Sequence, residues 1–251
     1  QRFVREGRTP PSAEALNAHV PWHYKIDFGA VTTREMRLPF EYDYHRIRGS
    51  MFMGLAAEIC GEQRRDMSVL DVACHCGVFS LEFAERGFGD VRGVDLRAEN
   101  IAQARFLAET FAVPNVRFEI GNARNVGKLE PADIVFCGGL LYHVTFPMEL
   151  FADIFSRTRE FAIIDTMAQK HPFSGFHLIC TKDTAVSTEG ETFYEFVPTY
   201  RGLIDALQAV GFAEVYEVLG GEQTAGVPPY AETRRYVKKV KNWMRANPAS
   251  E

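Results

Sequence analysis

The strongest structural signal in the chain is the segment Val69-Leu70-Asp71-Val72-Ala73-Cys74-His75-Cys76-Gly77-Val78-Phe79-Ser80. It predicts a buried strand that leads into a tight loop and then into a helix, which brings backbone N–H groups and a helix N-terminus close to a ligand. The next predicted strand, over residues 90–95, ends at Asp95. A carboxylate about 20 residues beyond such a loop is placed to accept hydrogen bonds from ribose hydroxyls. Together the two features predict a cofactor that contains a nucleoside.

The alternation of apolar runs with amphipathic segments extends over residues 68–165 and predicts an α/β fold. Helices are expected between the strands, so the sheet should be mostly parallel, with right-handed crossovers and helices on both faces. Strands are predicted at residues 68–73, 90–95, 116–120, 133–137 and 161–165, with two more at 215–219 and 233–240 that would complete a doubly wound sheet of seven strands.

Two segments differ in composition from this core. Residues 1–67 are dense in aromatic side chains and contain a predicted helix at 46–60, which indicates a helical, aromatic cap over the open end of the sheet. Residues 166–198 form a long connection rich in Gly, Ser, Thr and aromatic residues, which predicts a substrate cap inserted into a core that spans 68–251. A helix is expected at 199–210, capped by Thr199 and ended by Gly211.

Composition and charge restrict the classes of partner. The 251 residues carry a net charge of −5, with a pI of about 5.9, which favours a small-molecule partner over nucleic acid. Clustered cations occur near residues 234–245, where the pattern fits either a solvated face or an anion or RNA patch. No apolar run approaches 18 residues and no apolar segment follows the basic N-terminal residues, so a cytoplasmic location without a membrane partner is expected. The oligomeric state is not indicated.

The five cysteines predict free thiols in a reducing compartment, because their number is odd and several lie in apolar strands. Cys74 and Cys76 have no second Cys or His pair nearby, so their C-x-C spacing does not predict a zinc site, and no metal is expected.

The ordered motifs resemble those of the Rossmann-like S-adenosylmethionine-dependent methyltransferases over residues 69–219. Asp71 and Gly77 match the first motif, although Ala73 and His75 stand where the family has glycines, and Asp95 matches the acidic ribose ligand. The resemblance also covers residues 121–123 and 133–143, and it implies S-adenosylmethionine as the cofactor. The cofactor-binding residues that it implies are Asp71, Ala73, His75, Gly77, Asp95, Leu96, Asn122, Ala123 and Gly138.

The departures from the glycine pattern leave alternatives open. A dinucleotide is disfavoured, because the loop lacks G-x-G-x-x-G and His75 would crowd a pyrophosphate. Either the backbone at His75 has a negative φ and tolerates a side chain, or the imidazole points at the methionine carboxylate or into the substrate pocket. A weaker similarity to transfer RNA wobble-uridine methyltransferase-like enzymes is carried by Pro21-Trp22-His23 and Leu140-Leu141-Tyr142-His143. It keeps a carboxylated form of the cofactor open.

His143 is the predicted catalytic base, because it follows the fourth strand by a few residues and ligands bind at the carboxyl ends of strands in open α/β sheets. Its alternative role is to cap the next helix or to pack under the cap. The cap supplies two further catalytic candidates, His23 and Tyr24. The candidates for substrate binding are Trp22, Tyr142 and Asp165.

These features support three functions. The leading hypothesis is an enzyme that transfers a methyl group from S-adenosylmethionine to a small molecule by in-line displacement. One alternative is a methyl- or carboxymethyltransferase that modifies wobble uridine in transfer RNA, and another is a non-catalytic scaffold that binds a nucleoside. The sequence does not specify the acceptor, or whether oxygen, nitrogen or carbon is methylated.

Overall fold

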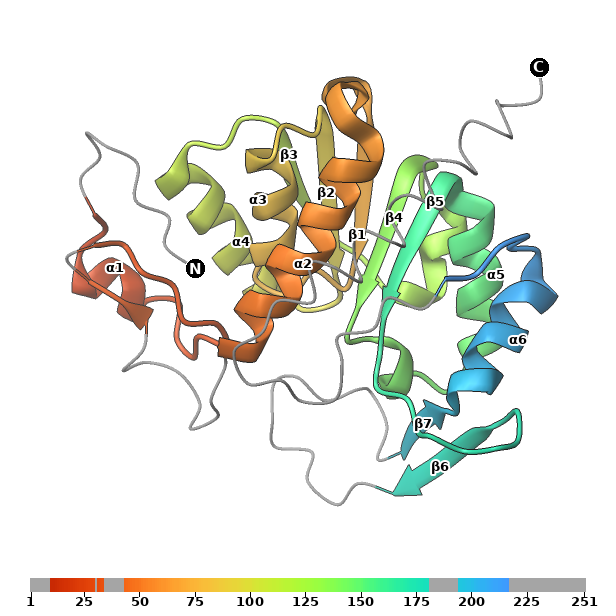
Figure 1. Cartoon of the computed structure of the whole chain (residues 1–251). Coiled ribbons are helices and arrows are strands. Elements are labelled where there is room, and N and C mark those ends of the chain that lie inside the picture. The colour runs from red at the N-terminus through yellow and green to blue at the C-terminus, as the bar shows by residue number, and fades with distance from the viewer. Residues whose placement is uncertain (1–9, 30, 34–42, 181–193, 217–251) are drawn as a thin grey trace.

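The structure is a computed structural model that describes residues 10–29, 31–33, 43–180 and 194–216 (Figure 1). Its central sheet contains five parallel strands in the order β3-β2-β1-β4-β5. The strands are β1 (Ser68–Val72), β2 (Asp90–Asp95), β3 (Val116–Ile120), β4 (Ala132–Gly138) and β5 (Thr158–Asp165). The chain runs outward from β1 to β3 and then returns to β4, so the strand order reverses between β1 and β4. Ligands bind at this point in doubly wound folds.

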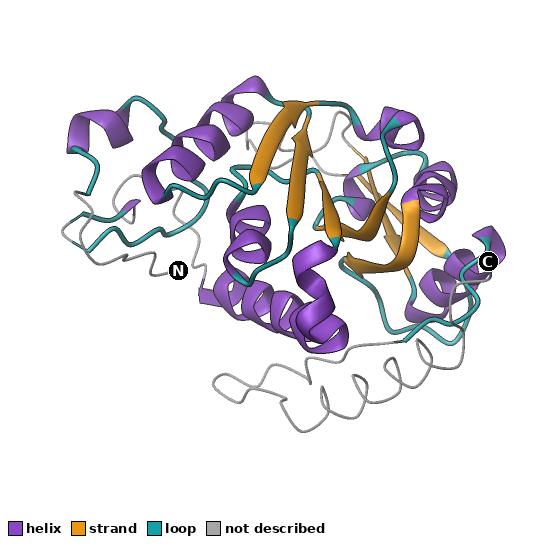
Figure 2. Ribbon diagram, turned by 90° about the horizontal axis from the view of Figure 1, so that it is seen from above, coloured by secondary structure: helices purple, strands orange, loops and turns teal. Residues whose placement is uncertain are grey.

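Helices cover both faces of the sheet, as Figure 2 shows from above. The first face carries α2 (Asp43–Cys60), α3 (Val78–Glu85) and α4 (Ala98–Phe111), and the second carries α5 (Pro147–Arg157) and α6 (Tyr200–Val210). The short helices are α1 (Ala13–Asn17) and the 3-10 helices η2 (Gly61–Asp66), η3 (Ala123–Lys128) and η4 (Leu141–His143). The predicted α/β fold with helices on both faces is confirmed.

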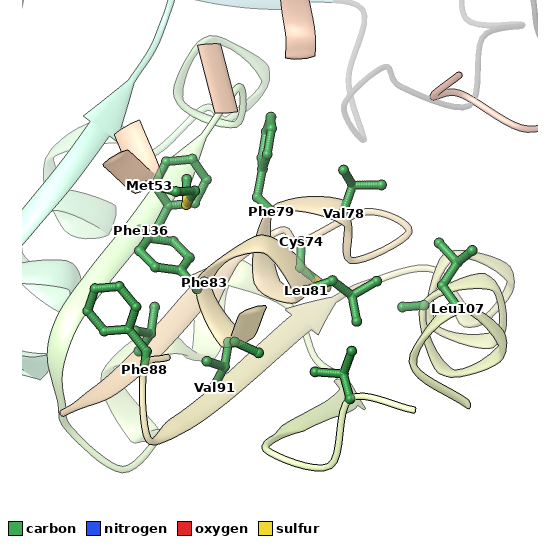
Figure 3. Packing of buried hydrophobic residues seen from close by; sticks show 14 of the residues in the cluster. Met53, Cys74, Val78, Phe79, Leu81, Phe83, Phe88, Val91, Leu107 and Phe136 are labelled. Atoms are coloured by element: carbon green, nitrogen blue, oxygen red, sulfur yellow. The ribbon is translucent and has the colours of Figure 1, made fainter. Parts of the chain in front are cut away.

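The pleat of the strands divides the core into two clusters. Val69 of β1 faces the first cluster, whereas Leu70 and Val72 face the second, as expected when successive side chains alternate between faces. Figure 3 shows aromatic rings gathered in the first cluster, where Phe83 lies edge-on to both Phe88 and Phe136. The central strands β1 and β4 are buried on both faces and are mostly apolar, which is typical of parallel sheets, whereas β3 at the edge is largely exposed.

The predicted count of seven strands in one sheet is not confirmed. The remaining described strands, β6 (Phe176–Cys180) and β7 (Tyr194–Pro198), pair antiparallel with each other in a separate hairpin within the predicted cap at 166–198. Figure 1 shows this hairpin at the end of the central sheet where β5 finishes. Val215 and Tyr216 are not in a strand. The rest of the predicted strand at 215–219, the predicted strand at 233–240 and the basic residues near 234–245 lie outside the described residues.

The segment around Trp22 is fixed to α4 and positions the residues that follow it. The Trp22 indole N–H donates to the Leu16 carbonyl at 3.0 Å, and the side chain is 0% exposed. The Gln103 side chain of α4 donates to the carbonyls of His19 and Pro21. This anchoring places His23 and Tyr24 against the loop that follows β1.

Candidate active site

A cavity of about 430 Å³ lies at the carboxyl ends of β1, β2 and β4, beside the point where the strand order reverses. Its lining includes Ala73 after β1, Asp95 at the end of β2 and Gly138 at the end of β4. His23 and Tyr24 contribute from the N-terminal segment, and Glu195 contributes from β7. The volume is within the range of small-molecule sites, roughly 300–1,000 Å³.

The loop after β1 has a left-handed backbone at three positions. The φ angles are +60° at Ala73, +52° at His75 and +74° at Gly77, which caps the N-terminus of α3. Of the two alternatives for His75, the one with a negative φ is therefore wrong. Hydrogen bonds hold the loop in this shape, because Cys74 N–H donates to the Val94 carbonyl and His75 N–H donates to Asp95 Oδ2, each at 2.9 Å. The loop and the end of β2 thus form one unit.

Replacing Gly77 with alanine is expected to destabilise the protein by roughly 2–4 kcal/mol, from the left-handed backbone and the overlap together. A Cβ there would lie 2.5 Å from the Phe118 ring and 2.9 Å from the Ala104 Cβ. Gly61 is the matched control, since its φ is +55° but nothing lies within 4 Å, so Gly61→Ala should cost only about 1 kcal/mol. Urea unfolding measures the free energy of unfolding of the two variants. Equal decreases in Gly77→Ala and Gly61→Ala would contradict the argument from packing.

The Asp95 carboxylate is held in a fixed orientation at the cavity wall. Oδ1 accepts hydrogen bonds from Arg97 N–H at 3.0 Å and from the Asn100 amide at 2.9 Å, while Oδ2 accepts from His75 N–H. The residue is 7% exposed and lines the cavity. A carboxylate that is already oriented can accept further hydrogen bonds from a vicinal diol without losing side-chain entropy, so the site fits the ribose of a nucleoside.

Asp71 lies beneath the site and does not line the cavity. Its Oδ2 accepts a hydrogen bond from the Ser80 hydroxyl at 2.6 Å, which links β1 to α3. Burial raises the pKa of Asp71 to about 7, and the Ser80 hydrogen bond opposes this rise. The contacts of Asp71 therefore support the loop from below.

His143 lies in η4, just beyond β4, and lines the same cavity as the loop after β1. Its backbone N–H donates to the Leu140 carbonyl at 2.8 Å, and its ring lies 4.1 Å from that of Tyr142. Burial and, to a smaller extent, the positive charge of Arg97 lower the pKa of His143 to about 4. The imidazole is thus neutral at pH 7 and is able to accept a proton.

Three rings close one wall of the cavity. The His23 and His75 rings lie 4.9 Å apart, and Tyr24 is edge-on to both, at 4.8 Å from His23 and 5.7 Å from His75. His75 Nδ1 accepts a hydrogen bond from Cys76 N–H at 2.8 Å, so the proton of the neutral ring is on Nε2. The left-handed backbone directs this imidazole toward the cap.

Most of the predicted site residues come together around the cavity. Those that line it are His23, Tyr24, Ala73, His75, Asp95, Leu96, Asn122, Ala123, Gly138, Tyr142 and His143. Asp71, Gly77 and Trp22 lie outside its lining, in the supporting structure. Asp165 lines a second cavity, of about 510 Å³, between β5, α2 and α6.

Three charged lining residues were not predicted. Arg97 and Arg124 directly follow predicted cofactor-binding segments, so their position in the sequence could have identified them. The Arg124 guanidinium lies 3.9 Å from the centre of the Phe146 ring. Glu195 has no such local signal, because only the β6–β7 hairpin brings it to the cavity.

Among the residues that the structure describes, no disulfide links the cysteines, and Cys74 is among the residues that line the cavity. The five cysteines are free thiols, with Cys180 exposed and the others buried. Burial raises the pKa of Cys137 to about 12, so it is a thiol at neutral pH. No group of three or more His, Cys, Asp or Glu side chains in the described ranges is arranged to bind a metal ion. In the same part of the chain, no helix is long and apolar enough to span a membrane.

Comparison with known proteins gives a consistent set of similarities. Residues 63–206 match the model of the family described as methyltransferase domain. The chain is 27% identical to the ubiquinone biosynthesis O-methyltransferase of Neisseria meningitidis serogroup A / serotype 4A over 126 residues, which is 49% of this chain and 51% of that protein. It is 26% identical to the tRNA U34 carboxymethyltransferase of Helicobacter pylori over 168 residues, 62% of this chain and 59% of that protein. The chain thus spans between half and three fifths of the length of these relatives.

Solved structures share the fold. The N-terminal domain of EvdMO1, crystallised in the presence of SAH and D-fucose, aligns with a TM-score of 0.61 and 21% identity over 80% of this chain and 85% of that one. Coclaurine N-methyltransferase, bound to N-methylheliamine and SAH, aligns with a TM-score of 0.50 and 16% identity over 62% of this chain and 47% of that one.

Proposed function

The chain belongs to the methyltransferase domain family, and from this we propose that it transfers a methyl group from S-adenosylmethionine to a small-molecule acceptor. The observation that carries the proposal is that one cavity joins the fixed Asp95 carboxylate to the neutral His143 imidazole. The relatives named as methyltransferases and the SAH-bound structural neighbours support the choice of donor.

The residues present fit the donor. Asp95 would hold its ribose, residues 96, 122 and 123 its adenine, and the loop from Ala73 to His75 its methionine end. The bound donor supplies a methyl group on a sulfonium, which is already an excellent leaving group. The protein's main contributions are therefore to align the acceptor with the methyl carbon, at about 3–3.5 Å, and to exclude water.

Enclosure of the cavity favours a small acceptor. The His143 side chain is 14% exposed, and the cavity wall includes residues 23 and 24 from one segment and Glu195 from another. A nucleotide within a polymer would have to leave its stacked position to reach such a base, at a cost that is smallest in a single-stranded segment. A free small molecule avoids this cost.

A second candidate is a wobble-uridine methyl- or carboxymethyltransferase, which two observations favour. The similarity to the Helicobacter pylori enzyme covers more of this chain than the similarity to the Neisseria enzyme does. In addition, Arg97 and Arg124 line the cavity, and a guanidinium is a suitable partner for the extra carboxylate of a carboxylated donor.

A transfer assay separates these functions. Purified protein is titrated calorimetrically with S-adenosylmethionine, its carboxylated form and S-adenosylhomocysteine, and is then incubated with methyl-labelled donor and a panel of phenols, sugars, amines and bulk transfer RNA. We expect binding of S-adenosylmethionine and label in a small molecule. Failure of all three ligands to bind would overturn the choice of donor. Label only in RNA would support the second candidate, and binding without transfer to any acceptor would favour the non-catalytic scaffold.

A further inference from the structure

A carboxylate from a distant part of the chain faces the predicted base. Glu195 Oε1 lies 3.7 Å from His143 Nδ1, and the two side chains are 18% and 14% exposed. His143 comes from the turn after β4, whereas Glu195 comes from β7 in the inserted hairpin. Both line the cavity that holds Asp95. A buried carboxylate next to an imidazole is a means of orienting the ring and stabilising its charged form.

The hairpin holds Glu195 on its inward face. Glu195 pairs with Ile179 across the hairpin, and Val197, two residues further along the same face, is buried. The opposite face carries Leu178 and Tyr194, which are exposed. Glu195 therefore points toward η4 as a consequence of strand alternation.

The base of the hairpin is fixed by a network around Thr199. The Thr199 hydroxyl donates to the Phe173 carbonyl at 2.9 Å and accepts hydrogen bonds from Gly175 N–H and Gly202 N–H. Gln169 N–H donates to the Pro198 carbonyl at 2.8 Å. Because α6 starts at this network, the position of β7, and with it that of Glu195, is tied to the core.

We propose that Glu195 is a positioning residue that directs Nδ1 of His143 toward itself and Nε2 toward the acceptor, so that His143 serves as the base for a hydroxyl acceptor. This proposal rests on the proposed methyl transfer. An amine acceptor that arrives neutral can attack before it loses a proton, whereas a hydroxyl needs a base in the transition state. A carboxylate behind the base is therefore useful mainly for O-methylation.

His143 Nε2 takes the hydroxyl proton as the acceptor oxygen bonds to the methyl carbon, and the carbon–sulfur electron pair passes to the sulfonium sulfur. The products are a methyl ether, a neutral thioether and an imidazolium on His143. Glu195 balances the imidazolium charge until the proton passes to solvent. The Nδ1–Oε1 distance of 3.7 Å is longer than a hydrogen bond, as is common before a catalytic site closes on its ligands.

The charges around His143 act in opposite directions. Arg97, at the junction of β2 and α4, lowers its pKa, as does burial. Glu195 from β7 favours the imidazolium, because opposite charges this close stabilise each other. Tyr142 contacts the ring from the same turn, and Asp95, Arg124 and the His23–Tyr24–His75 wall complete the ionisable lining of the cavity. Removing the charge of Glu195 takes away the carboxylate that lies 3.7 Å from Nδ1, while burial and Arg97, which lower the pKa, remain.

The test is a histidine NMR titration of the S-adenosylhomocysteine complex in wild type, Glu195→Gln and Glu195→Asp, with the His143 signal assigned by its absence in His143→Asn. We expect Glu195→Gln to lower the proton affinity of His143 about tenfold, which is one pKa unit, and Glu195→Asp to restore part of it. Glu149→Gln, an exposed substitution in the first turn of α5, is the matched control and should change nothing. An identical His143 titration in wild type and Glu195→Gln would overturn the proposal.

Transfer assays test the acceptor class separately. With catechol and D-fucose as hydroxyl probes and ethylamine as an amine probe, Glu195→Gln should lower hydroxyl methylation at least tenfold while calorimetric affinity for S-adenosylhomocysteine stays within twofold. If Glu195→Gln leaves the rate with hydroxyl probes unchanged, or if wild type methylates only the amine, the hydroxyl assignment is wrong. If wild type does not bind S-adenosylhomocysteine, the proposed function fails. The titration of the ligand-free protein then still tests the His143–Glu195 pair.

Discussion

Replacing His143 with alanine is expected to lower kcat for methyl transfer by roughly 10²- to 10⁴-fold, the usual contribution of a general base. The imidazole lines the cavity, is neutral at pH 7 and lies next to the Glu195 carboxylate. The methyl side chain of the alanine variant cannot accept a proton. Donor affinity should change less than about twofold, because the groups placed around ribose and adenine come from other strands. Labelled methyl transfer and calorimetry with S-adenosylhomocysteine measure the two quantities separately.

The pH dependence gives a further check on the same variant. A base must be deprotonated to act, so kcat/KM of wild type should fall as pH drops through the pKa of His143, which is about 4 in the free protein, and should be flat above it. The alanine variant should not show this fall of kcat/KM at low pH, over the pH range in which circular dichroism shows that it is folded. His171→Ala, at an exposed position, is the control and should keep both rate and profile. Normal turnover in His143→Ala would remove His143 from the catalytic role.

Replacing Asp95 with asparagine is expected to weaken binding of S-adenosylhomocysteine by about 100-fold or more. Each hydrogen bond to a charged acceptor contributes roughly 1.5–3 kcal/mol, and every 1.4 kcal/mol is a factor of ten in affinity. Asp95 now accepts hydrogen bonds from His75 N–H, Arg97 N–H and the Asn100 side chain. The NH₂ group of asparagine is itself a donor, so it would face at least one of these donors without a hydrogen bond. Isothermal titration calorimetry gives the dissociation constant directly.

The opposite end of the same strand supplies the control for Asp95. Asp90 begins β2, is partly exposed and pairs with Arg117, so Asp90→Asn changes the same charge on the same strand without reaching the cavity. Its affinity for S-adenosylhomocysteine should equal that of wild type. Equal loss in both variants would mean that stability, and not the ribose contact, governs binding.

The part of the cavity lining at the strand ends could be predicted because its residues lie next to those ends. In a parallel sheet the carboxyl ends of all strands meet at one edge, so Asp95, Asn122 and Gly138 come together once the strands are identified. Asp165 is likewise the last residue of a strand. However, β5 is the edge strand beyond β4, and its end lines the second cavity. Whether a strand-end residue lines the first or the second cavity depends on where its strand lies in the sheet, and the local sequence does not contain this information.

The lining that includes Tyr24 and Glu195 depends on contacts between segments far apart in the sequence. Glu195 reaches His143 only because β7 pairs with β6 and turns one face inward. Trp22 and Tyr24 lie two residues apart in an aromatic segment, yet Trp22 is in the core and Tyr24 lines the cavity. The hydrogen bond from Trp22 to the Leu16 carbonyl, which no periodicity reveals, makes the difference. The left-handed φ at His75 was missed because a side chain at such a position is uncommon.

The β6–β7 hairpin pairs with itself and not with the central sheet, so the two are separate hydrogen-bonded units. Exchanging its sequence would replace the carboxylate and the shape presented to the acceptor without breaking any ladder hydrogen bond of the five-stranded sheet that supports Asp95. We therefore expect that substitutions confined to this hairpin can alter the shape and charge of the cavity while the surroundings of Asp95 keep their structure.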